Sequence, residues 1–383
     1  MTLPSDPRGQ LPLPRRGPRT RLGWKLSLLL GSSVLAAVFA VVGLELWLRS
    51  RYASVSEITG VAPWTTADYH GLSYHWDAYH PRYGWTNAPG YRSDERVPFG
   101  LQVNEQGLRA SSDYLPRPPA GHRRVAVFGD SCTFGEEVDD DQTLPVHLER
   151  AMEAVEVLNF GVHGWGPGQM LLRLQDEAAA FHPDHVVVVL LLPWDLQRPG
   201  LSFFVHSRPV FGVQDGELEI RGIPVPMASL EPWLCRRSYA VAWAACRRLQ
   251  ARSIPPLEQQ LQTAHALIEQ MQQACDGMGA TLDVALIVTD SPELRGALGR
   301  DVIDPMRVSL AGAPTSVIDL VDPIGELLAS GGGARLTAPL GHWNGAGNRA
   351  IAAFLSTRLA QRHGLTIRDG PEDGEVDEQD LRR

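Results

Sequence analysis

Residues 125–135 read VAVFGDSCTFG, an apolar run that ends in a glycine-flanked turn. A short apolar run closed by glycine predicts a buried strand over Val125–Phe128. A serine on the tight turn after that strand, Ser131, can point its hydroxyl into a crevice with its own N–H near the start of the next helix. This stretch predicts the first strand of an open sheet with a nucleophile at its carboxyl end.

The same pattern repeats along the chain. Four further apolar runs predict strands, and between them lie segments with helical periodicity. Strands that alternate with helices predict an α/β fold with a mostly parallel sheet and helices on both faces. The predicted strands are 155–160, 185–192, 282–288 and 317–320, and the predicted helices are 142–153, 168–181, 238–249, 257–278 and 344–361.

Two more segments fall where functional groups gather in such folds, near the carboxyl ends of strands. Residues 159–164, NFGVHG, follow the second strand, and their glycines let backbone N–H groups approach a ligand closely, as an oxyanion hole requires. Residues 341–344, GHWN, precede the last helix, and His342 there can take the proton of Ser131 and return it to a leaving group.

These three segments, in this order, resemble the SGNH/GDSL hydrolase family over about Val125 to Gln361. Gly84-Trp85 and residues 104–109, NEQGLR, resemble the lead-in of bacterial membrane-anchored members. The resemblance implies a flavodoxin-like three-layer α/β/α sandwich with a five-stranded parallel sheet. It also implies that Ser131 is the nucleophile and an oxyanion-hole donor, Gly161 the second oxyanion donor, and His342 the general base.

The sequence departs from the family pattern at two positions. Trp194 stands where the family has an oxyanion-hole asparagine, and Pro339 stands where it has the aspartate that orients the histidine. An indole N–H differs from an amide in size and aim. Asp195 and Asp319, both at predicted strand ends, are candidates to orient His342, and a backbone carbonyl would also serve.

The N-terminal region predicts a membrane anchor. Leu26–Leu44 carries no charge and is close to the roughly 20 residues that span a bilayer. Six basic residues precede it and two closely follow it, which predicts a cytoplasmic N-terminus and an exported domain, periplasmic or extracellular, at the inner (cytoplasmic) membrane. A cleaved signal peptide with Val38-Phe39-Ala40 before the cut is the alternative, although the apolar stretch exceeds the usual length of about 7–15 residues.

We divide the chain as follows: 1–25, basic cytoplasmic tail; 26–48, transmembrane helix; 53–120, irregular lead-in that packs on the main domain; 121–365, hydrolase-like domain with a small insertion at about 197–250; 366–383, acidic disordered tail. The net charge of −9, with no concentrated basic surface, argues against a nucleic-acid partner. The four cysteines match no metal motif, so neither a metal nor a cofactor is expected.

Two functions follow. The first is an exported serine esterase or O-acyltransferase, which acts on ester-linked acyl groups of a small molecule or, by family resemblance and location, a cell-envelope glycan. The second is a catalytically degenerate binding or scaffold protein in envelope polysaccharide assembly, which the substitutions at Trp194 and Pro339 motivate.

Overall fold

The computed structural model describes most of the chain outside the two ends. Its described residues are 19–51, 68–69, 72–73, 76–95, 97–204, 206–225, 237–250, 254–289, 298–310, 315–329 and 336–368. The predicted acidic tail from residue 369 onward and the first 18 residues of the basic tail lie outside these ranges.

A five-stranded parallel sheet forms the centre of the molecule. Its strands are β5 (Arg123–Phe128), β6 (Val155–Asn159), β7 (His185–Leu191), β12 (Thr281–Ile287) and β13 (Ser316–Asp319), in the order β13-β12-β7-β5-β6. All seven residues of β7 are buried, because a central strand is covered on both faces. The predicted fold class and its five strands are confirmed.

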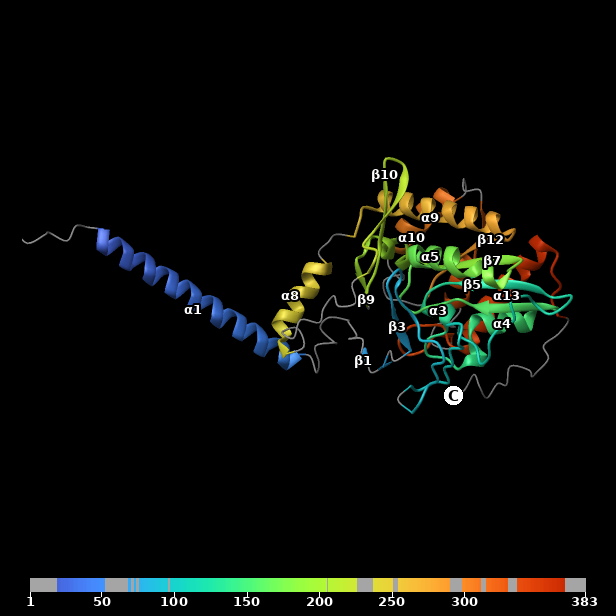
Figure 1. The fold of residues 1–383 in the computed structure, drawn as a ribbon, viewed down its shortest axis with the longest axis horizontal. Coiled ribbons are helices and arrows are strands. Elements are labelled where there is room, and N and C mark those ends of the chain that lie inside the picture. The colour runs from blue at the N-terminus through green and yellow to red at the C-terminus, as the bar shows by residue number, and fades with distance from the viewer. Residues whose placement is uncertain are drawn as a thin grey trace, which may run out of the picture.

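Helices cover both faces of the sheet (Figure 1). The helices α4 (Leu144–Ala151) and α13 (Gly345–His363) pack together on one side, and α5 (Pro167–Glu177) and α9 (Leu257–Met278) pack together on the other. The helices α10 (Leu298–Leu310) and α11 (Val321–Leu327) were not predicted, and Pro305 inside α10 obscures its helical pattern. The remaining short helices are α3 (Ser131–Phe134), α6 (Trp194–Gln197), η1 (Asp140–Gln142), η2 (Ala178–Phe181) and η3 (Arg198–Gly200).

The lead-in is more ordered than predicted. It contains the strand pairs β1 (Asp68–Tyr69) with β2 (Leu72–Ser73), and β3 (Asp77–His80) with β4 (Gly84–Asn87). Trp76 and Trp85 are fully buried, and Trp76 belongs to a second small core that includes Phe134 of the nucleophile helix. These aromatic residues pack the described part of the lead-in against the main domain.

The insertion forms a projecting hairpin and one helix. The strands β10 (Val210–Gln214) and β11 (Glu217–Arg221) pair around an Asp215-Gly216 turn. A pair of two-residue strands, β8 (Phe203–Phe204) with β9 (His206–Ser207), precedes them. The helix α8 (Tyr239–Gln250) follows.

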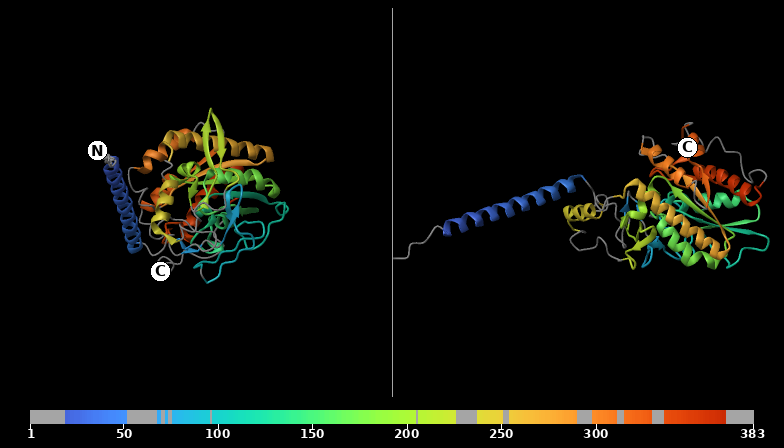
Figure 2. Two further views of the ribbon diagram at one scale, coloured as in Figure 1. Left: turned by 60° about the vertical axis from the view of Figure 1, so that its left-hand side comes forward. Right: turned by 90° about the horizontal axis from the view of Figure 1, so that it is seen from above.

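The long helix α1 (Arg19–Arg51) extends away from the domain and contacts α8 at its carboxyl end (Figure 2). It is long and apolar enough to cross a membrane, and none of its apolar span is buried inside the protein. Glu45 accepts hydrogen bonds from Ser238 Oγ at 2.8 Å, Tyr239 N at 3.1 Å and Ala240 N at 2.8 Å. The end of α1 therefore caps the amino end of α8.

Candidate active site

Ser131 is the first residue of the short helix α3, directly after β5, and is 6% exposed. Asp130 precedes it as N-cap, and its Oδ1 accepts a hydrogen bond from Cys132 N at 3.0 Å. The other oxygen, Oδ2, lies 2.7 Å from Arg198 Nη1, which also binds Asp195 Oδ1 at 2.8 Å. The turn that carries Ser131 is thus fixed by a buried ion-pair network, in which Asp130 acts as a brace.

The loop after α3 is held by Arg109 of the lead-in, which is 4% exposed. Its guanidinium donates hydrogen bonds to the carbonyls of Phe134, Gly135 and Val138 and pairs with Asp140 at 2.9 Å. A planar guanidinium offers five donors, so one side chain can satisfy a whole irregular loop. This explains why an arginine ends the NEQGLR segment.

His342 is presented by a tight turn before α13. The backbone N–H of Ala338 donates to His342 O at 2.8 Å, and Gly341 adopts a left-handed φ of 93° within this turn. Thr289, which follows β12, donates its hydroxyl to Gly341 O at 2.6 Å. The turn therefore brings the imidazole to the same edge of the sheet as Ser131.

Glu137 orients the imidazole. Its Oε2 lies 2.7 Å from His342 Nδ1, and its Oε1 accepts a hydrogen bond from Leu340 N at 2.9 Å. The residue has a φ of 70°, which is unusual for a side chain other than glycine, asparagine or aspartate. The backbone N–H groups of Gly135 and Glu136 both donate to Ser131 O, which ties this loop to the nucleophile.

The two residues predicted to orient His342 lie elsewhere. Asp195 binds Arg198 and Leu191 N, and Asp319 pairs with Arg307 at 2.5 Å. Both are at strand ends as predicted, but each already neutralises an arginine. The residue that contacts His342 Nδ1, Glu137, lies six positions after Ser131 and was not predicted.

The surroundings of His342 favour its protonated form. Burial lowers the pKa of the imidazole, but the carboxylates of Glu136, Glu137 and Asp130 outweigh that effect, so the pKa lies above its ordinary value. Glu136 Oε2 is 3.7 Å from His342 Nε2, on the side of the ring opposite Glu137. The carboxylates of Glu136 and Glu137 therefore lie on opposite sides of the His342 imidazole.

The second loop packs closely on the nucleophile helix. A Cβ on Gly161 would lie 2.3 Å from Phe134 N and 2.8 Å from its Cα, so only glycine fits. The N–H of Gly161 donates to Asn159 Oδ1 at 2.9 Å, which corrects its predicted role as an oxyanion donor in this structure. Asn87 of the lead-in donates to Gly161 O at 3.0 Å and holds the loop from the other side.

Trp194 is half-buried at the start of α6, packed against the main core at the carboxyl end of β7. In the sheet order β7 is the neighbour of β5, the strand that Ser131 follows.

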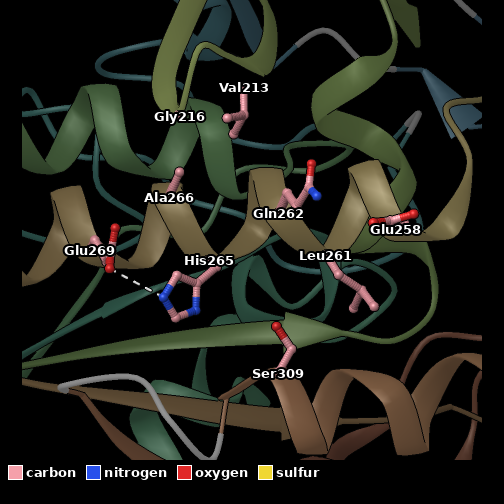
Figure 3. Close-up of a pocket in the computed structure, with 9 residues that line it drawn as sticks. All are labelled: Val213, Gly216, Glu258, Leu261, Gln262, His265, Ala266, Glu269 and Ser309. Carbon is pink, nitrogen blue, oxygen red and sulfur yellow. Dashed lines mark ion pairs between the residues drawn. The ribbon is translucent and has the colours of Figure 1, made fainter.

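A separate groove of about 640 Å³ lies between the β10–β11 hairpin and the helices α9 and α10 (Figure 3). None of the predicted site residues lines it. Within the described ranges, no group of histidine, cysteine, aspartate or glutamate side chains could hold a metal ion. The groove is lined by Val213, Gly216, Glu258, Leu261, Gln262, His265, Ala266, Glu269 and Ser309.

No protein-family model matches the sequence, and no curated protein matches it. Solved structures with a similar fold include a lipolytic protein of the G-D-S-L family from Veillonella parvula, 15% identical over 63% of this chain and 99% of that one, with a TM-score of 0.38. A lipase/acylhydrolase from Enterococcus faecalis is 17% identical over 65% and 100%, with a TM-score of 0.39. An alpha/beta hydrolase enzyme from the metagenome of Lake Arreo, Spain, is 15% identical over 62% and 95%, with a TM-score of 0.41.

In this chain Ser131 follows the first strand of the five-stranded parallel sheet, and His342 precedes the last helix of the described residues.

Proposed function

We propose that the protein is a membrane-anchored, exported serine esterase or O-acyltransferase with Ser131, His342 and Glu137 as its catalytic triad. The observation that carries this proposal is the 2.7 Å contact between Glu137 Oε2 and His342 Nδ1. A carboxylate on Nδ1 fixes the tautomer that leaves Nε2 free to accept the serine proton. Glu137 thereby restores the support that Pro339 removes.

In the proposed reaction Ser131 Oγ attacks the carbonyl carbon of an ester while His342 Nε2 takes the hydroxyl proton. The tetrahedral intermediate collapses when the imidazolium returns this proton to the departing alkoxide, which leaves an acyl-serine. Water or a sugar hydroxyl then gives its proton to His342 and attacks the acyl carbon. The bond from that carbon to Ser131 Oγ breaks as the imidazolium returns the proton to Oγ, which releases the acylated acceptor and restores the serine. The N–H of Ser131, at the first helical position, has no acceptor within the helix and suits the developing oxyanion.

The contacts and the flanking charges of α1 support an exported location of the domain. Because Glu45 caps α8 and Arg49 Nη2 donates to Arg237 O at 2.7 Å, the end of α1 is part of the folded protein. Such contacts favour a retained anchor over a cleaved signal peptide. With the basic flank inside, the domain lies outside the membrane. Figure 1 places β3 and the nucleophile helix α3 on the side of the sheet that faces α8.

The ester-linked acyl group of an envelope glycan is the proposed substrate.

A catalytically degenerate binding domain is the second candidate. The occupied N–H of Gly161 and the indole at Trp194 favour it, because losing one oxyanion donor typically costs about 100- to 1,000-fold in rate. It predicts a folded protein with no acyl-enzyme.

The test uses the full chain in detergent with p-nitrophenyl acetate. We expect a burst of p-nitrophenol and an acetylated Ser131 in the wild type, and neither in Ser131→Ala. Equal turnover in Ser131→Ala and wild type contradicts the proposed nucleophile. A folded wild type with no acetylation at any pH favours the binding domain.

A further inference from the structure

Buried acidic and basic side chains form a charge chain that runs from the lead-in to His342. Asp77 on β3 lies 2.7 Å from His163 Nε2 and 2.8 Å from His206 Nε2. The other ring nitrogen of His163, Nδ1, is 4.0 Å from Glu136 Oε2. That same oxygen is 3.7 Å from His342 Nε2, so the chain runs from Asp77 to the catalytic base.

All members of this chain before His342 are withdrawn from water. The side chains of Asp77 and His163 are each 2% exposed, that of Glu136 is 3% and that of His206 is 4%. Aromatic rings enclose them, because Trp76 lies edge-on to His163 at 6.0 Å and Trp85 edge-on to His206 at 5.4 Å. Charges in so apolar a place interact strongly, since little solvent screens them.

The chain has a defined charge pattern. Burial lowers the pKa of His163, but Asp77 and Glu136 outweigh burial and raise it above its ordinary value. Burial raises the pKa of Asp77, but His163 and His206 outweigh it and hold it low. Asp77 and His163 therefore both favour their charged forms, and the side chain of Glu136 lies next to His163.

Glu136 has few other partners. Its Oε1 is buried with no hydrogen-bond partner among the residues that the structure describes, and its Oε2 faces the two imidazoles. The other charged groups that act on it or on His342 are Arg109 from the lead-in, Asp130 before α3 and Glu137 after it. A buried carboxylate requires compensating charge, and here His163 and His342 are the nearest imidazoles.

We propose that Asp77, His163 and Glu136 form a positioning chain, supplied jointly by the lead-in and the second loop, that sets the protonation balance of His342. This inference rests on the proposed function of His342 as the base. Glu136 holds negative charge beside Nε2 and stabilises the imidazolium that forms when Ser131 gives up its proton. The positive charge of His163, which Asp77 maintains, offsets part of the negative charge of Glu136. The pKa of His342 therefore rises less, and part of His342 stays neutral and can accept the proton.

The chain predicts shifts of opposite sign. Glu136→Gln removes negative charge 3.7 Å from Nε2, so the pKa of His342 falls. Asp77→Asn removes the partner that keeps His163 charged, so positive charge near Glu136 is lost and the pKa of His342 rises. His163→Gln removes the same positive charge directly and should act in the same direction as Asp77→Asn. Each variant should shift the pKa of His342 by about 1 unit, the lower end of the range of about 1–3 units that a nearby charge produces.

The experiment measures the rate of Ser131 labelling by a fluorophosphonate against pH, together with NMR titration of ¹³C-labelled histidines, with His342→Gln to assign the signal. In the wild type the rate should rise through a midpoint above the ordinary imidazole value of about 6.5. The midpoint should move down in Glu136→Gln and up in Asp77→Asn and His163→Gln. His265→Gln, in the distant groove, is the matched control and should leave the midpoint unchanged.

Shifts of the same sign, or no shift in folded variants, overturn the proposal. Melting temperatures identify variants that fail to fold, and because two variants test the upward shift, loss of one leaves the other. If the wild type is never labelled, the proposed function fails, but the NMR titration of His342 still decides the charge chain independently.

Discussion

At the scale of single residues, Glu137 is the carboxylate that contacts the imidazole of His342. Glu137 contacts both His342 Nδ1 and Leu340 N, so it fixes the ring and the turn that carries it. It does so from a left-handed backbone conformation, which L-residues adopt at some cost. The loop thus holds Glu137 in a strained conformation from which its carboxylate reaches the base.

We predict that Glu137→Gln lowers kcat by about 100- to 10,000-fold, because an amide does not stabilise the imidazolium as a carboxylate does. KM should change little, since Glu137 does not face the substrate side of the ring. Asp319→Asn is the control and should retain wild-type kcat, because Asp319 pairs with Arg307. Equal loss of activity in both variants would show that the assignment of the third residue is wrong.

At the scale of elements, the second loop and the nucleophile helix are in direct backbone contact. We predict that Gly161→Ala destabilises the protein by about 1–3 kcal/mol, because the added Cβ overlaps the backbone of Phe134. Gly277→Ala in α9 is the matched control, with nothing within 4 Å of its Cβ, and should stabilise by up to about 1 kcal/mol. Denaturant unfolding measures both, and a neutral Gly161→Ala would contradict the close contact.

The elements themselves follow from the sequence more readily than the site does. Buried parallel strands are continuous apolar runs, so His185–Leu191 and Thr281–Ile287 were predicted almost to the residue. Ser131 and His342 were placed by motifs next to such elements. Glu137 was not, because its contact with His342 joins segments 205 residues apart through a loop without periodicity. The burial of Trp76 and Trp85 depends on long-range packing in the same way.

At the scale of the whole molecule, three parts of the chain converge on one edge of the sheet. The lead-in supplies Arg109 and Asp77, the main domain supplies Ser131, His342 and Glu137, and the insertion supplies His206. The lead-in thus contributes side chains to the proposed site. The helix α1 contacts this assembly through Glu45 and α8.

We predict that Glu45→Ala weakens the α1–α8 junction by about 0.5–2 kcal/mol, the usual effect of removing a helix cap. Hydrogen exchange of the full chain in lipid nanodiscs should show faster exchange at Tyr239 and Ala240. Glu217→Ala on the distant hairpin should leave these amides unchanged. Unchanged exchange in Glu45→Ala, or a mature N-terminus directly after Ala40, would contradict a retained and docked anchor.

The central claim is that Ser131 is a nucleophile activated by His342. Intact-mass analysis of the full chain after fluorophosphonate treatment tests it most directly. The account predicts one adduct per chain, located on Ser131, absent from Ser131→Ala and slowed at least about 100-fold in His342→Gln. A folded, unlabelled wild type, or an adduct that persists in Ser131→Ala, would contradict it.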